Sequence, residues 1–191
     1  MVEKGFTIIL MTHNFVILPD FGPILIGHAL IIPKRHITSF ACLSDIEIKE
    51  LETIIQKVRD AIWHNYGLYT EFFEHGSDIS LVNSMASVSH AHLHIMPVES
   101  PTDLGPTNME WKNSDFYSLI NDKEAQNDGY LLFCQVDGQI KIAKYEKAIS
   151  QFFRKYYASI SGNQKWNWKN ERNKEMLIKT LDFYSGLRLE I

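Results

Sequence analysis

Three histidines at alternate positions are the residues of this sequence best suited to chemistry. His90, His92 and His94 stand in the segment HAHLHIMP. Successive side chains of a β-strand point to opposite faces, so in a strand these three rings would share one face. Ala91 and Leu93 would point to the other face, which is apolar. Burial does not explain this pattern, because a core strand does not place polar rings side by side without partners.

The spacing of the rings favours a phosphoryl ligand over a metal ion. Neighbouring rings on one strand face lie about 6–7 Å apart along the strand, and the outer two about 13 Å apart. Two neighbouring rings can share one ion, but the outer two cannot, so a metal site leaves one histidine unused. A phosphoryl group with its leaving group is larger and can contact successive rings. Neutral imidazole is also a nucleophile at pH 7, and a charged neighbour can donate a proton.

Two blocks of the sequence resemble the histidine triad superfamily. The first is the triad itself, followed by two apolar residues. The second lies upstream and reads Gly27-His28-x-Leu30-x-x-Pro33-x-x-His36. With Asp20, seven residues before the glycine, these blocks fall within residues 15–97, about half of the chain. The chain is therefore similar to a histidine triad protein that carries a C-terminal extension.

The resemblance implies catalytic roles for the three triad residues. His92 corresponds to the nucleophile that forms a nucleotidyl-histidine intermediate. His94 would hydrogen-bond the α-phosphate or the leaving-group oxygen, and His90 would help to fix the neighbouring ring and the phosphate. We expect no bound metal ion and no other cofactor, because imidazole supplies the nucleophile and hydrogen bonds supply the charge stabilisation.

Three further residues correspond to nucleotide-binding positions of the superfamily. Asp20 stands where the family holds the ribose with an acid or asparagine. His28 stands where a further histidine packs near the nucleophile, and Ser87 where some members contact the leaving-group side. Ala86 departs from the family pattern, because some members that cleave dinucleosides have glutamine there. This departure leaves the leaving group open.

The resemblance implies hydrolysis or transfer at the α-phosphate of a nucleotide, of the phosphoramidate or dinucleoside polyphosphate class. A nucleotidylyltransferase would share the first half-reaction. Two alternatives come from other classes: a non-catalytic nucleotide sensor, and a cupin-like metal-binding module formed by His92-x-His94 and Glu99. The cupin-like module lacks a second motif and does not explain His90. The expected partners are a nucleotide substrate and a second copy of the chain in a homodimer.

The first hundred residues predict an antiparallel sheet packed by one helix, which is an α+β fold. Ser44 followed by Glu47 three residues later is a capping box, and apolar residues at helical spacing continue to near Gly67. The expected helix therefore covers Ser44–Tyr66. The expected strands are Phe15–Leu18, His28–Ile32, Tyr69–Glu74 and Ala91–Val98.

A stretch rich in proline and glycine, Pro101 to Pro106, divides the chain into a nucleotide-binding core at residues 1–100 and an extension at residues 101–191. Asp137-Gly138 between two apolar runs predicts a hairpin, and two helical patterns follow. Arg154 could reach a phosphate, but we expect it on a solvated helix face. The extension is expected to contain Tyr130–Val136, Gln139–Tyr145, Glu146–Ser161 and Glu171–Leu187.

Length, composition and charge exclude several other classes of protein. The chain has 191 residues, is 45% hydrophobic and carries a net charge of −4, which gives no footprint for general nucleic-acid binding. No run of 18 apolar residues predicts a membrane span, and the N-terminus does not read as a signal peptide, so we expect a cytoplasmic protein. Cys42 and Cys134 are too few for a disulfide scaffold and lack metal-site spacing.

Overall fold

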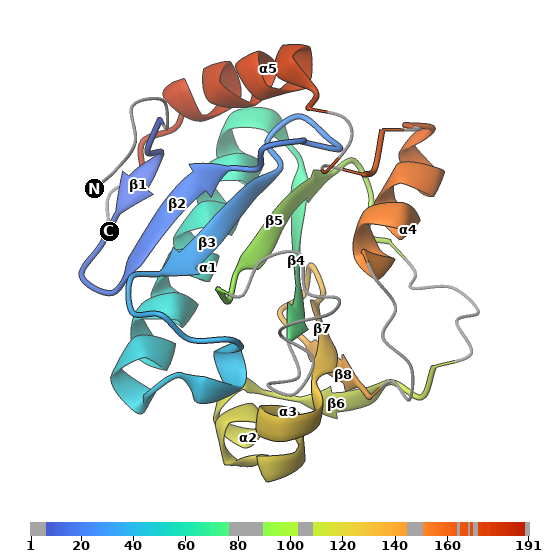
Figure 1. Ribbon diagram of the computed structural model, residues 1–191. Coiled ribbons are helices and arrows are strands. Elements are labelled where there is room, and N and C mark those ends of the chain that lie inside the picture. The colour runs from blue at the N-terminus through green and yellow to red at the C-terminus, as the bar shows by residue number, and fades with distance from the viewer. Residues whose placement is uncertain are drawn as a thin grey trace.

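The computed structural model describes residues 7–76, 90–102, 109–144, 151–163, 165–167, 169 and 172–189. One antiparallel sheet forms the centre of this part of the chain (Figure 1). Its eight strands, in spatial order, are β1 (Leu10–Met11), β2 (Phe15–Pro19), β3 (Ala29–Pro33), β5 (Leu93–Val98), β4 (Tyr69–Gly76), β7 (Tyr130–Cys134), β8 (Ile140–Ala143) and β6 (Lys112–Ser114). Every neighbouring pair runs antiparallel, which confirms the expected α+β fold.

Helix α1 (Asp45–Tyr66) packs against one face of the sheet, and its ends agree with the prediction. Ser44 Oγ accepts a hydrogen bond from the Glu47 backbone N–H, and the Glu47 carboxylate accepts one from the Ser44 N–H. This capping box satisfies donors that the first turn leaves free. The helix ends at Gly67, which adopts a left-handed conformation at φ 65°. Its buried apolar residues are Ile48, Leu51, Ile54, Ile55, Val58 and Ile62.

Helix α4 (Phe152–Ser161) covers part of the opposite face of the sheet (Figure 1). Neighbouring residues of β4 therefore pack on opposite faces of the sheet. Phe72 lies in the apolar cluster beneath α1, and Phe73 lies in the cluster with α4. Helix α5 (Lys174–Ser185) lies across one end of the sheet and buries Phe183 and Tyr184. The aromatic residues of α4 and α5 thus pack in the two apolar clusters on this chain's own sheet.

Several predicted elements are shorter than expected. Strand β5 begins at Leu93 and not at Ala91, so His94 lies in the strand while His90 and His92 precede it. The hairpin of β7 and β8 is confirmed, with Gly138 at φ 91° in its turn. The helix expected from Glu146 begins at Phe152, and residues 145–150 lie outside the described part.

Several short elements were not predicted. They are β1, β6, the 3-10 helix η1 (Phe40–Cys42) and the short helices α2 (Phe116–Asn121) and α3 (Lys123–Asp128). Hydrophobic periodicity needs a window of about 11 residues or more, so elements this short leave no periodic signal. Local capping signals are nevertheless present. The Asp115 carboxylate accepts a hydrogen bond from the Ser118 N–H, and Asp122 accepts from the Glu124 N–H.

The sheet continues across residue 100, because β4 pairs with β5 on one side and with β7 on the other. The predicted division into a core at residues 1–100 and an extension at residues 101–191 therefore stays a prediction. The sheet ends at β1 and β6, of 2 and 3 residues, which offer little edge for pairing with another chain. The homodimer stays a prediction. Cys42 and Cys134 are free thiols, and none of the described helices is long and apolar enough to cross a membrane.

Candidate active site

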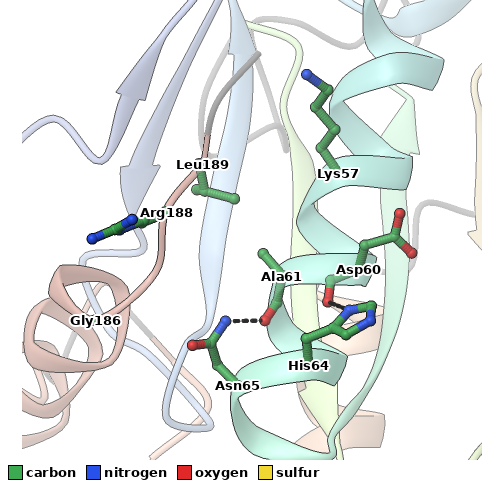
Figure 2. A pocket seen from close by; sticks show the side chains of 8 residues that line it. All are labelled: Lys57, Asp60, Ala61, His64, Asn65, Gly186, Arg188 and Leu189. Carbon is green, nitrogen blue, oxygen red and sulfur yellow. Dashed lines mark hydrogen bonds between the residues drawn. The ribbon is translucent and has the colours of Figure 1, made fainter.

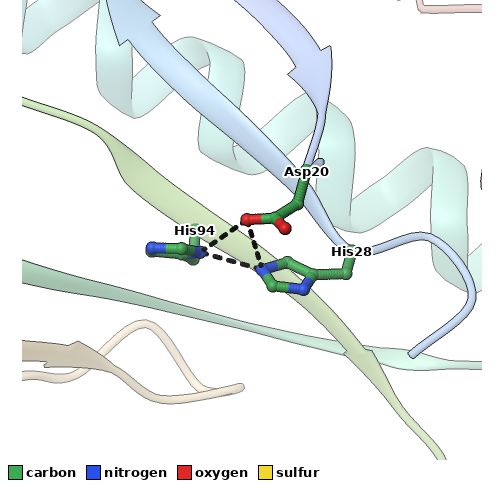
Figure 3. A group of neighbouring side chains, drawn as sticks. All are labelled: Asp20, His28 and His94. Atoms are coloured by element: carbon green, nitrogen blue, oxygen red, sulfur yellow. Dashed lines mark hydrogen bonds and ion pairs between the residues drawn. The ribbon is translucent and has the colours of Figure 1, made fainter. Parts of the chain in front are cut away.

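Three adjacent strands bring Asp20, His28 and His94 together (Figure 3). Asp20 directly follows β2 and His28 directly precedes β3, and the Asp20 N–H donates to the His28 carbonyl at 3.1 Å. His94 lies on β5, where it is paired with Leu30 of β3. All three side chains are buried. Ser87, the other predicted nucleotide-binding residue, lies outside the described residues.

Hydrogen bonds fix the tautomer of His28. The Ile24 backbone N–H donates to His28 Nδ1 at 3.2 Å, so this nitrogen carries a lone pair and the neutral ring holds its proton on Nε2. His28 Nε2 lies 2.8 Å from His94 Nδ1 and donates to it. His94 must then carry its proton on Nε2. The neutral His94 ring consequently offers an N–H donor on the side away from His28.

His92 has the opposite arrangement. Its Nδ1 lies 2.9 Å from the backbone carbonyl of His90, and because a carbonyl only accepts, Nδ1 holds the proton. Nε2 of His92 therefore carries the lone pair of a nucleophile. The rings of His92 and His94 are neighbours, with centroids 5.0 Å apart. His90 itself donates from Nε2 to the Pro33 carbonyl at 2.7 Å and packs edge-on against the exposed His36.

Burial keeps these rings neutral. It is the largest cause that lowers the pKa of His28 and His94 well below the usual value of 6.5. The pKa of His92 is also lowered, again mainly by burial, although the hydrogen bond to His90 opposes the shift. All three rings are accordingly neutral at pH 7, which is the state in which imidazole is a nucleophile.

Arg154 was expected on a solvated helix face, and that prediction is wrong. The side chain is 4% exposed and reaches from α4 to Asp20, where Nη1 donates to Asp20 Oδ2 at 3.0 Å. The stem of a long side chain buries readily when its charge has a partner. Asp20 is 5% exposed, and its other oxygen accepts from the Gly22 N–H at 2.8 Å. A ribose contact by Asp20 stays a prediction.

Stacked aromatic rings pack against His94. Phe73 of β4 stacks on His94 with centroids 4.2 Å apart and planes inclined by 16°. Phe153 of α4 stacks on the other side of Phe73 at 4.6 Å. The orientation of the His94 ring thus depends on a helix more than fifty residues away in the sequence. The motif spacing gave no sign of this contact.

Asp20, His28 and His94 are also the described residues whose donor atoms could converge on a metal ion, since these atoms lie within 4.8 Å of one another. Their hydrogen bonds do not fit that use. His28 Nε2 holds a proton and donates to His94, and the carboxylate is already paired with Arg154. The cupin-like set fits no better, because Glu99 is exposed beyond the end of β5.

A separate surface hollow lies along α1 (Figure 2). Its volume is about 590 Å³, and the C-terminal segment from Gly186 to Leu189 forms its second wall. Two polar side chains of α1 hydrogen-bond to carbonyls of their own helix there. His64 Nδ1 donates to the Asp60 carbonyl at 2.6 Å, and Asn65 donates to the Ala61 carbonyl at 2.8 Å. This hollow contains none of the predicted site residues.

Gly27 shapes the loop that leads into His28. Its φ is 83°, and a Cβ atom placed there would lie 2.7 Å from the Pro97 ring and 2.8 Å from the Phe183 ring. Gly27→Ala is therefore expected to lower the free energy of unfolding by about 1–2 kcal/mol for the left-handed backbone, and further for the crowding. Gly67→Ala is the matched control, because φ is also positive but no atom lies within 4 Å. Urea unfolding should show a larger loss for Gly27→Ala, and equal losses would contradict the crowding.

An α+β fold that brings neutral, hydrogen-bonded histidines together beside a buried aspartate is typical of a histidine triad protein. The chain belongs to the family described as "Scavenger mRNA decapping enzyme C-term binding", whose model matches residues 3–110.

Known proteins resemble parts of the chain. An asymmetrical bis(5'-nucleosyl)-tetraphosphatase from Schizosaccharomyces pombe is 31% identical over 107 residues, which are 52% of this chain and 56% of the relative. The nitrilase and fragile histidine triad fusion protein NitFhit from Caenorhabditis elegans is 31% identical over 87 residues, 44% of this chain and 18% of that protein. The chain thus spans little more than half of the first relative and less of the second.

Two solved structures are similar at low identity. A yeast Ap4A phosphorylase in complex with AMP aligns with a TM-score of 0.48 at 12% identity, over 71% of this chain and 57% of that chain. A hypothetical histidine triad nucleotide-binding protein from Sulfolobus tokodaii aligns with a TM-score of 0.38 at 23% identity, over 50% of this chain and 62% of that chain.

Proposed function

We propose that the chain hydrolyses or transfers nucleotides at the α-phosphate through a nucleotidyl-histidine intermediate. The observation that carries this proposal is the pair of opposite tautomers at His92 and His94. The neutral His92 ring has its lone pair on Nε2, and the neutral His94 ring has its N–H on Nε2. The similarity to a bis(5'-nucleosyl)-tetraphosphatase supports a substrate of the dinucleoside polyphosphate class, with phosphoramidates as the related alternative.

The reaction has two displacements at phosphorus. His92 Nε2 attacks the α-phosphorus, a P–N bond forms, and the bond from phosphorus to the leaving group breaks. The leaving group departs with the electron pair and takes a proton from solvent or from the site. The His94 N–H donates to an α-phosphate oxygen or to the leaving group, where charge increases. Water or a second acceptor then attacks phosphorus, releases the nucleotide and restores neutral His92.

His90 and Asp20 would support these steps. The His90 carbonyl fixes the proton of His92 on Nδ1, so that Nε2 is the reactive atom. Asp20 would hold the ribose if a hydroxyl reaches one of its oxygens, which are otherwise bonded within the chain. Ser87 would contact the leaving-group side.

Mass spectrometry of the intact chain tests the proposal. The protein is mixed with an adenosine phosphoramidate and with dinucleoside polyphosphates of several bases, in the presence of a chelator, and quenched under alkaline conditions that preserve phosphoramidate bonds. We expect a mass increase of one nucleotidyl group, which is a nucleoside monophosphate less one water, absent from His92→Ala. Nucleotide binding without an adduct or turnover would support the sensor instead, and activity that needs a retained transition metal would support a metal site.

A further inference from the structure

Arg154 makes three hydrogen bonds inside the fold, which together fix the orientation of its guanidinium. Nη1 donates to Asp20 Oδ2 at 3.0 Å, Nη2 to the Gly22 carbonyl at 2.6 Å and Nε to the Trp166 carbonyl at 2.8 Å. The donors are directed at the loop after β2 and at the chain's own C-terminal segment. A planar group held this way acts as a fixed cation at one place.

Asp20 connects this cation to the histidine pair. Asp20 Oδ2, the oxygen that Arg154 contacts, lies 3.7 Å from His28 Nε2 and 3.8 Å from His94 Nδ1 (Figure 3). These two nitrogens share the hydrogen bond that sets both tautomers. We propose that Arg154 is a positioning residue, which through Asp20 holds the His28–His94 pair in one neutral arrangement with the His94 N–H free for the substrate.

The charge balance explains why a cation is needed. A buried carboxylate beside two imidazoles favours an extra proton on them, because an ion pair in a low-dielectric site is better than an isolated charge. A proton on His94 Nδ1 would remove the acceptor of the N–H···N bond between the rings, and a proton on His28 Nδ1 would remove the acceptor of the Ile24 N–H. With Arg154 in place, Asp20 already has its counter-charge and the pair stays neutral.

Few other charged or titratable groups face the pair among the described residues. His92 lies before β5 and lowers the pKa of His94, and His75 of β4 lies near His92. Arg154 contributes to the lowered pKa of His28, His92 and His94, whereas Asp20 raises those of His92 and His94. Burial is the largest cause of the lowered pKa values, and Arg154 and Asp20 are opposing charges that act on these rings in addition.

Ring nitrogen chemical shifts test the proposal without any substrate. Long-range ¹H–¹⁵N spectra distinguish the two neutral tautomers and the imidazolium, and they are recorded from pH 5 to 9 on the full chain. In Arg154→Met we expect the pair to take up a proton at a pH higher by about one unit or more, since an uncompensated carboxylate typically raises a neighbouring pKa by that amount. Lys155→Met is the matched control, because it removes an exposed charge from the same helix.

A second substitution separates this role from a merely structural one. In Asp20→Asn/Arg154→Met both charges are gone, so the ring titration should return toward that of the wild type. Arg154→Lys keeps a cation beside Asp20 and should leave the histidine pair neutral. This variant tests the role of the charge even if Arg154→Met folds poorly. A titration in Arg154→Met equal to that in Lys155→Met, or no return in the double variant, would overturn the proposal.

The consequence for turnover rests on the proposed function. The acid limb of the pH profile of kcat/KM should move to higher pH in Arg154→Met, and back in the double variant. A failure of the proposed function would appear as no adduct and no turnover in the wild type, while the ring titrations would still be measured and interpreted. The two failures are therefore distinguishable.

Discussion

His92→Ala is expected to lower turnover by a factor on the order of 10⁴ or more, since removing a covalent nucleophile leaves only binding and electrostatic stabilisation. The structure gives the reason for this expectation. Nε2 of His92 is the ring nitrogen that carries the lone pair, and burial lowers the pKa of His92 so that the ring is neutral. Turnover of an adenosine phosphoramidate and of a dinucleoside polyphosphate measures the loss.

Two neighbouring substitutions are controls for this result. His90→Ala should leave measurable turnover, because His92 donates to the backbone carbonyl of residue 90, which alanine retains. His64→Ala changes an exposed histidine on α1 and should leave turnover unchanged. Circular dichroism and urea unfolding of each variant exclude a loss through unfolding. A His92→Ala protein that keeps a tenth or more of the wild-type turnover would show that His92 is not the nucleophile.

Elements whose signals are local in the sequence were predicted well. The helix from Ser44 to Gly67 has a capping box at one end and a glycine at the other, and both act within a few residues of the chain. The hairpin around Asp137-Gly138 is equally local, because its turn determines the register of the two strands. The short helices α2 and α3 were missed because only their caps, and no periodic stripe, mark them.

The candidate site was predictable only in the part that two sequence blocks define. His28 and His94 meet because each block places a histidine on adjacent strands, although they are 66 positions apart. The solvated position predicted for Arg154 is wrong, because its partner Asp20 is 134 positions away and no local pattern links an arginine to a distant carboxylate. Long-range ion pairs depend on the finished packing, which a single sequence does not display.

The buried acid Glu74, which lies outside the histidine site, should make the stability of the fold depend on pH. Glu74 of β4 lies beneath η1, where Oε1 accepts from the Phe40 N–H at 2.8 Å and Oε2 is hydrogen-bonded to Tyr130 Oη at 2.5 Å. Burial raises the pKa of Glu74 from 4.5 to about 8. No cation is among the causes, so the folded chain favours the protonated acid.

The sign of the effect follows from proton binding. Between pH 4.5 and about 8 the folded chain holds a proton on Glu74 that the unfolded chain has released, so the free energy of unfolding falls as pH rises. The slope approaches about 1.4 kcal/mol per pH unit. His28 and His94 act in the opposite sense, because their pKa is lowered on folding and their contribution is lost as pH falls below 6.5.

Glu74→Gln isolates the contribution of this acid. Glutamine keeps an oxygen for the Phe40 N–H and places an NH₂ group opposite the Tyr130 hydroxyl, but it does not titrate. We expect the free energy of unfolding of the variant, relative to that of the wild type, to rise by roughly 2–4 kcal/mol between pH 5 and 8. The reason is that only the wild type loses stability as its buried acid comes under pressure to ionise. Urea unfolding at several pH values measures the difference, and Glu52→Gln on the exposed side of α1 is the matched control. A difference between Glu74→Gln and wild type that does not change with pH would show that Glu74 is not held protonated by the fold.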